Sequence, residues 1–133
     1  MSKIYRLFVS HSWNYSDNYN KVIDFIRKQK IVFYNHSVPK NDPINTNGTD
    51  LQLKNAIEAK MKGTSCIILL AGLYARYSKW INKEIEIAQL YNKPIIAIEH
   101  WGSERTSEVI KKTANRIVKW NGSLIASAIR ELG

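Results

Sequence analysis

The run Ser65-Cys66-Ile67-Ile68-Leu69-Leu70-Ala71 lies near the middle of the chain and is apolar without interruption from Cys66 to Ala71. A strand with one face in water alternates apolar and polar residues. A strand of a parallel sheet is covered on both faces, so it reads as a continuous apolar run. We therefore predict that residues 65–71 form a central strand of a parallel sheet.

Outward from this run, short apolar segments alternate with segments of helical period. The predicted strands are 4–10, 31–35, 65–71, 94–99 and, more weakly, 116–120. The predicted helices, each with a candidate N-cap, are 17–28 after Ser16, 50–62 after Thr49, 79–91 after Ser78 and 122–132 after Asn121. This alternation predicts an α/β fold, a flavodoxin-like three-layer sandwich whose five-stranded parallel sheet has the order 2-1-3-4-5 and helices on both faces. Ligands of such sheets bind at the carboxyl ends of the strands.

Length and composition fit one globular domain spanning residues 1–133, with 44% hydrophobic and 23% charged residues. No segment approaches the roughly 18 consecutive apolar residues that cross a bilayer, and the N-terminus lacks the apolar core of a secretory signal. We therefore expect a soluble, cytoplasmic protein with no membrane partner. The single cysteine, Cys66, cannot form an internal disulfide, and its place in the apolar run predicts a small buried side chain rather than a nucleophile.

The chain is strongly basic, with a net charge of +9 and a pI of about 9.7. Such a charge suits an anionic partner, whether a nucleotide, a nucleic acid or a phospholipid. The basic residues are scattered, however, and the densest groups are Arg27-Lys28 and Lys111-Lys112. A solvated surface explains this pattern as well as a functional patch does. No motif supports a nucleic-acid partner, so nucleic-acid binding is the weakest of the alternatives.

Two classes of phosphate chemistry are excluded by specific residues. The six glycines are isolated, so neither GxGxxG nor GxxxxGK[ST], the usual cradles for dinucleotide and nucleoside phosphates, occurs. A phosphoacceptor receiver domain of the same topology needs acidic residues after the first strand, where this chain has Ser10, His11 and Ser12. Phosphotransfer is therefore not expected.

Glu84 is out of place on the helix predicted over 79–91. At 100° per residue it falls in the second turn, in the middle of an apolar arc, whereas Glu86 falls on the opposite, polar side. The arc is formed by Trp80, Ile81, Ile85, Ile87, Ala88 and Tyr91. A carboxylate that faces the sheet is costly unless it is paired, hydrogen-bonded or open to a cleft. Glu86 is therefore predicted to be an inert surface carboxylate, and the position of Glu84 needs an explanation.

Two explanations of Glu84 are open. One is structural, either an ion pair with a basic residue such as Arg6, Arg76 or Lys3 or partial exposure at the edge of the helix. The other is a ligand cleft, because polar and aromatic side chains follow the other strands at the same edge of the sheet. These are His11, Ser12 and Trp13 after 4–10, His36 and Ser37 after 31–35, and His100 and Trp101 after 94–99. Their spacing does not suit zinc, and we expect no metal site.

Two segments resemble TIR domains. Phe8-Val9-Ser10-His11-Ser12 resembles their first strand, and Ser78-x-Trp80-x-x-x-Glu84 resembles the helix that carries their catalytic glutamate. The whole chain is similar to the short bacterial TIR-like proteins of Thoeris antiphage defence. This resemblance implies that Glu84 is the catalytic carboxylate and that NAD+ is the substrate, with no further cofactor. The substrate-binding residues that we expect from it are Phe8, His11, Ser12, Trp80, His36 and Asn45.

The resemblance also implies an activity and partners. Members of that family cleave the bond between nicotinamide and ribose, so we expect an NAD+ nucleosidase or ADP-ribosyl cyclase that makes a cyclic ADP-ribose isomer as a defence signal. A separate effector protein is expected to sense this product. Self-association is expected through the loop 38–48, although this loop lacks the Arg-Asp…Pro-Gly box of animal and plant TIR domains. The alternative is a non-catalytic TIR-like interaction module in which Glu84 is a structural ion-pair partner.

Overall fold

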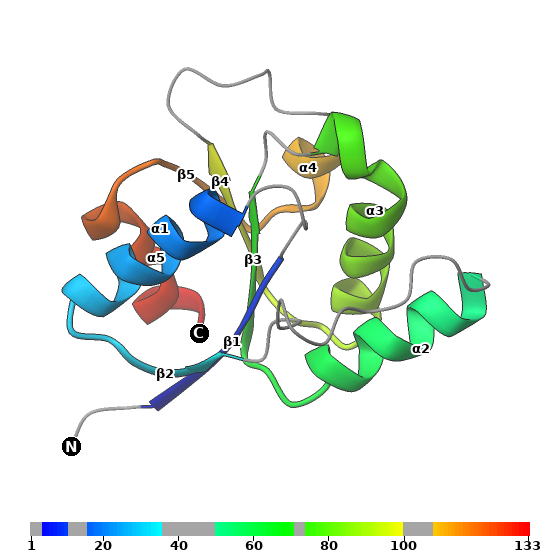
Figure 1. Cartoon of the computed structure of the whole chain (residues 1–133), viewed down its shortest axis with the longest axis horizontal. Helices are drawn as coiled ribbons and strands as arrows, with labels where there is room; N and C mark the ends of the chain where they lie inside the picture. The colour runs from blue at the N-terminus through cyan, green and yellow to red at the C-terminus, as the bar shows by residue number, and fades with distance from the viewer. Residues whose placement is uncertain (1–3, 11–15, 36–49, 71–73, 100–107) are drawn as a thin grey trace.

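A five-stranded, parallel β-sheet forms the centre of the fold (Figure 1). The structure, a computed structural model, describes residues 4–10, 16–35, 50–70, 74–99 and 108–133. The strands are β1 (Ile4–Val9), β2 (Val32–Asn35), β3 (Cys66–Leu70), β4 (Ile95–Glu99) and β5 (Arg116–Lys119). Their order across the sheet is β2-β1-β3-β4-β5, which confirms the predicted flavodoxin-like topology.

Helices cover both faces of the sheet. They are α1 (Ser16–Lys28), α2 (Asp50–Met61), α3 (Tyr74–Leu90), α4 (Glu108–Thr113) and α5 (Gly122–Leu132). Figure 1 shows α1 and α5 on one side of the sheet and α2 and α3 on the other, so the fold has three layers. Of these described helices, none combines the length and the apolar character needed to cross a membrane.

β3 is the buried centre that its sequence predicts. It lies between β1 and β4, with Phe8 beside Ile67 on one side and Ile95 beside Ile67 on the other. The side chains of Cys66–Leu69 are all fully buried. Apolar helix residues complete the layers on the two faces, among them Val22, Ile23, Ile26, Ile57, Met61, Ile81, Ile87, Ile125, Ala128 and Ile129.

The start of α3 differs from the prediction. The helix begins at Tyr74 rather than behind Ser78, so Ser78 lies inside the helix and its prediction as the N-cap is wrong. Serine is a favoured N-cap, but nothing between Leu73 and Ser78 interrupts a helix, and the nearest helix-breaking residue is Gly72. As the eleventh residue of α3, Glu84 is therefore in the third turn and not in the second.

The other helix ends agree more closely. Asn121 is confirmed as the N-cap of α5, because its side-chain oxygen accepts a hydrogen bond of 3.0 Å from the backbone N–H of Leu124. Ser16 is the first residue of α1 and not the residue before it, and Thr49 lies outside the described residues. The six-residue helix α4 has no counterpart among the predictions, since fewer than two turns are too short to display a period.

Candidate active site

A buried contact between Ser10 and Glu84 joins the carboxyl end of β1 to α3. Glu84 is 0% exposed, and Ser10, which directly follows β1, is 5% exposed. The Ser10 hydroxyl donates a hydrogen bond to Oε1 of Glu84 with an oxygen–oxygen distance of 2.8 Å. Two residues that are 74 positions apart in the sequence therefore form one polar contact inside the apolar layer between helix and sheet.

The strand geometry of β1 directs Ser10 at α3. The backbone N–H of Ser10 donates to the carbonyl oxygen of Ile68 at 2.7 Å, which continues the pairing of β1 with β3 by one residue. Side chains two residues apart on a strand share a face, so Phe8 lies on the same face as Ser10 and is itself buried. The hydroxyl of Ser10 is thus presented to the α3 side of the sheet by the ladder that builds the core.

The surroundings of Glu84 on α3 are apolar, as its helical position predicts. The neighbours Ile81, Ile85, Ile87 and Ala88 are all buried. A carboxylate removed from water among such residues requires hydrogen-bond donors, and Ser10 supplies one. The carboxyl end of β1 next to β3 is also where the strand order reverses, which is the ligand-binding edge of this fold.

Glu86 has the ordinary surface role that its position predicts. Its side chain is 54% exposed and lies 3.7 Å from Lys54 and 3.9 Å from Lys83. Of the three basic residues considered as ion-pair partners of Glu84, Arg6 has its guanidinium 5.2 Å from the ring centroid of Tyr34. The side chains of Arg76 and Lys3 lie outside the described part of the chain.

Cys66 is confirmed as a small buried side chain. Its thiol is fully buried in β3, and this burial raises its pKa to about 12, with a smaller opposing effect of a backbone hydrogen bond with Ile67. A thiol of this kind stays protonated near neutral pH, and the thiolate is the nucleophilic form. Cys66 is therefore not available as a nucleophile.

Residues 8–105 match the family model described as the TIR-like domain of Thoeris protein ThsB. The chain belongs to the Thoeris ThsB TIR-like family. The match covers both segments of this TIR-like domain that meet in the buried contact, the end of β1 with Ser10 and the helix with Glu84. No curated protein matches the chain.

Solved structures similar to this TIR-like domain share its fold. One is the CMP N-glycosidase BcmB of Clostridium botulinum, with a TM-score of 0.55, 15% sequence identity, and coverage of 94% of this chain and 98% of the other. Another is a 3-dehydroquinate dehydratase-like protein of Bifidobacterium longum, with a TM-score of 0.51, 8% identity, and coverage of 99% and 95%. At these identities the likeness is one of fold.

The predicted substrate-binding residues of the TIR-like domain are described in part. Phe8 is 1% exposed and lies in the core beside Ile67. Trp80 is a residue of α3, but its side chain lies outside the described residues. The remaining members of the set also lie outside them and stay predictions: His11, Ser12, His36 and Asn45. Within the described ranges no group of three His, Cys, Asp or Glu side chains could hold a metal ion.

Ser10 is the residue of the site that sequence analysis did not identify. The sequence feature that could have indicated it is a serine at the end of an apolar run, two residues after Phe8 and therefore on the same face of the strand. The sequence pattern places Ser10 at the correct edge of the sheet, but it gives no partner. The hydroxyl meets Glu84 only because α3 packs on the sheet near the carboxyl end of β1.

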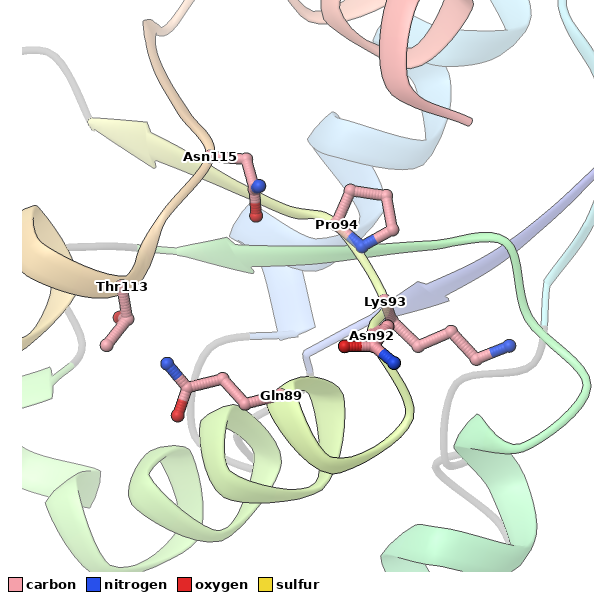
Figure 2. Close-up of a pocket in the computed structure, with 6 residues that line it drawn as sticks. All are labelled: Gln89, Asn92, Lys93, Pro94, Thr113 and Asn115. Atoms are coloured by element: carbon pink, nitrogen blue, oxygen red, sulfur yellow. The ribbon is translucent and has the colours of Figure 1, made fainter.

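A polar pocket lies at the amino ends of β4 and β5, whereas Ser10 lies at the carboxyl end of β1 (Figure 2). It has a volume of about 420 Å³ and is lined by Gln89, Asn92, Lys93, Pro94, Thr113 and Asn115. Asn115 has a structural role, because its side-chain oxygen accepts a hydrogen bond of 2.8 Å from the backbone N–H of Ile95 at the start of β4. In Figure 2 the side chain of Gln89 extends toward Thr113, whereas that of Lys93 points away from it. No predicted site residue lines this pocket, so the candidate active site remains at Glu84.

Proposed function

We propose that this TIR-like domain cleaves the N-glycosidic bond between nicotinamide and ribose in NAD+, with Glu84 as the catalytic carboxylate. The observation that carries the proposal is a fully buried carboxylate, hydrogen-bonded by Ser10, at the edge of the sheet where ligands of this fold bind. A carboxylate with a purely structural role is more readily placed at the surface, as Glu86 is.

The chemistry requires such a group. When the bond between C1′ of the ribose and the nicotinamide nitrogen breaks, the bonding electrons leave with nicotinamide, and positive charge develops on the ribose. Transition states of this oxocarbenium type are stabilised by a nearby carboxylate. The stabilisation is larger in a site that excludes water than in bulk solvent, because fewer water dipoles screen the charge. Glu84, surrounded by Ile81, Ile85 and Ile87, has these surroundings.

The family and the fold support the same reaction class. The chain belongs to a TIR-like family of Thoeris defence. BcmB, whose name states that it is an N-glycosidase of CMP, has the same fold over nearly all of this chain. Its reaction breaks a bond of the same kind, between a ribose carbon and a ring nitrogen of a nucleotide. A fold is weaker support than a site, so the assignment rests on Glu84.

The reaction has two possible products. Attack of water on the ribose cation gives ADP-ribose and releases a proton, whereas attack by another part of the same molecule gives a cyclic isomer. We propose the cyclic isomer as a diffusible signal that a separate effector protein senses. In this proposal NAD+ is substrate rather than cofactor and no metal is required. We propose separately that the chain self-associates through the loop 38–48.

A second candidate function is a non-catalytic interaction module. It is favoured by an exposed apolar surface on the β1–β2 edge, where Ile4, Val32 and Tyr34 are each more than half exposed and Ile4 pairs directly with Val32. Contiguous apolar side chains at a surface are typical of protein contacts. A stable complex that forms without NAD+ and is unaffected by Glu84→Gln would support this function.

The decisive experiment compares wild-type protein with Glu84→Gln and Glu86→Gln. Each protein is incubated with NAD+, consumption is followed over time, and products are identified by mass spectrometry and NMR. We expect Glu84→Gln to abolish NAD+ consumption and Glu86→Gln to leave it unchanged. Circular dichroism checks that all three proteins are folded. If folded Glu84→Gln protein consumed NAD+ as fast as the wild type does, the catalytic assignment would be overturned.

A further inference from the structure

Ser10 connects three elements of the candidate site. Its backbone N–H is bound to the carbonyl oxygen of Ile68 in β3, and its hydroxyl is bound to Glu84 in α3, at 2.7 and 2.8 Å. The residue itself continues β1. Because the backbone is held by the sheet and the serine side chain has a single rotatable carbon–carbon bond, the position of the hydroxyl is fixed by the core.

This arrangement restricts the direction in which Glu84 points. A glutamate side chain has three rotatable bonds, and the apolar side chains among its neighbours offer no directional contact that selects among its rotamers. The hydrogen bond at Oε1 does select, since it requires one oxygen to meet the Ser10 hydroxyl. A donor to a carboxylate also stabilises the ionised form over the protonated form. Preorganised groups of this kind are what a charged transition state requires.

We propose that Ser10 is a positioning residue that holds the Glu84 carboxylate in its reactive orientation and favours its ionised form over its protonated form. The proposal rests on the proposed function, because it assigns Ser10 a role in the same reaction. Ser10 acts through Glu84, so its loss affects the chemical step more than the binding of substrate. Its hydroxyl proton stays on Ser10 throughout and is not transferred.

Thr64 provides a matched comparison. It also carries a buried hydroxyl near a strand and is 2% exposed, but its hydroxyl donates to the backbone oxygen of Met61 at 2.6 Å. That bond closes a local turn before β3, three residues away in the sequence, whereas the bond of Ser10 spans 74. Loss of either hydroxyl removes one buried hydrogen bond, and only one of these bonds reaches Glu84.

The test compares Ser10→Ala, Ser10→Thr and Thr64→Ala in the NAD+ assay. We expect Ser10→Ala to lower kcat by about 10- to 100-fold with little change in KM, the size typical of residues that orient a reactive group. The acid limb of its pH–rate profile should move to higher pH, because Glu84 is protonated more readily without the donor. Ser10→Thr, which restores a hydroxyl, should recover most of the rate. Thr64→Ala should leave kcat and the profile unchanged, although it lowers the melting temperature to a similar extent.

A measurement without substrate separates this proposal from the proposed function. The side-chain carboxyl carbon of Glu84 is observed by NMR in carbon-13 glutamate-labelled protein, and its signal is identified by its disappearance in Glu84→Gln. We expect the titration of this signal to move to higher pH in Ser10→Ala and to stay in place in Thr64→Ala. If it moves in this way while wild-type protein leaves NAD+ intact, the proposed function fails, and the finding that remains is that Ser10 sets the ionisation of Glu84.

Two results would overturn the positioning role. One is an identical Glu84 titration in wild-type and Ser10→Ala protein. The other is an equal loss of kcat in Ser10→Ala and Thr64→Ala, which would mark a general loss of stability. If Ser10→Ala does not fold, Ser10→Cys takes its place, since its thiol has a similar size and is a much weaker donor. The same shift in titration is then expected of it.

Discussion

Glu84 and Glu86 lie two residues apart on α3, but the first is buried in the core and the second is mostly in solvent. One turn of helix thus carries a carboxylate hydrogen-bonded by Ser10 and another flanked by lysines. The same residue type in two environments gives a matched pair, in which helix propensity and charge number are equal and burial differs. Differences between variants at the two positions therefore report on burial and on the partners of each carboxylate.

We expect Glu84→Gln to stabilise the protein at neutral pH. The amide keeps an oxygen that can accept from Ser10, and it removes a charge from apolar surroundings, which should raise the free energy of unfolding by about 1–3 kcal/mol. Glu86→Gln removes an exposed charge and should change it by less than about 0.5 kcal/mol. Urea denaturation of both variants and the wild type measures these differences. A loss of about 3 kcal/mol or more in Glu84→Gln would instead identify a buried ion pair, because removal of one partner strands the other charge.

Cys66 should resist thiol reagents in the folded protein. Its thiol is buried, and its pKa of about 12 keeps it protonated across the usual assay range. A chromogenic disulfide reagent should titrate no thiol in native protein at mildly alkaline pH and one thiol per chain in denaturant. Cys66→Ala should keep the full activity of the wild type while losing some stability through the small cavity. Rapid native labelling, or loss of activity in folded Cys66→Ala, would contradict the buried role.

The fold could be predicted because its strongest signals are local. Burial on both faces requires an apolar side chain at every position of β3, and the unbroken apolar run that begins at Cys66 meets this requirement. The start of α3 could not be placed in the same way. Ser78 is chemically suited to an N-cap, but an N-cap exists only where the preceding backbone leaves the helix, and here the helix continues back to Tyr74.

The candidate site was predictable only from one side. The burial of Glu84 follows from its angle on a helix, which depends on residues within a few positions of it. Ser10 is in a different element, and no periodicity relates a strand end to a helix 74 residues later. The sheet order brings that strand end beside β3, and the packing of α3 on the sheet then completes the contact. The contact between Ser10 and Glu84 therefore depends on the tertiary structure and cannot be predicted from local sequence patterns.

Tyr91 should ionise at higher pH than a free tyrosine. Its hydroxyl donates to Oε1 of Glu58 on α2 at 2.7 Å, and this bond is the largest cause of a pKa raised above 10, followed by burial and by the charge of Glu58. A tyrosine whose pKa rises on folding favours the folded state below the unfolded pKa and loses this contribution as the pH passes the raised value. Ultraviolet absorbance titration of the wild type minus Tyr91→Phe isolates this group. Glu58→Gln should lower the midpoint, and an unchanged midpoint would show that the contact does not persist in solution.

The two apolar residues at the end of α3 should differ sharply in their contribution to stability. Ile87 is fully buried in the core, whereas Leu90 is 61% exposed on the same helix. Ile87→Ala removes buried methyl and methylene groups and leaves a cavity, so the free energy of unfolding should fall by about 3 kcal/mol. Leu90→Ala leaves the core intact and keeps a strong helix former, so its effect should stay within about 0.5 kcal/mol. Urea denaturation with an unchanged m-value checks both, and equal losses would show that Leu90 is covered in solution, for example by a second copy of the chain.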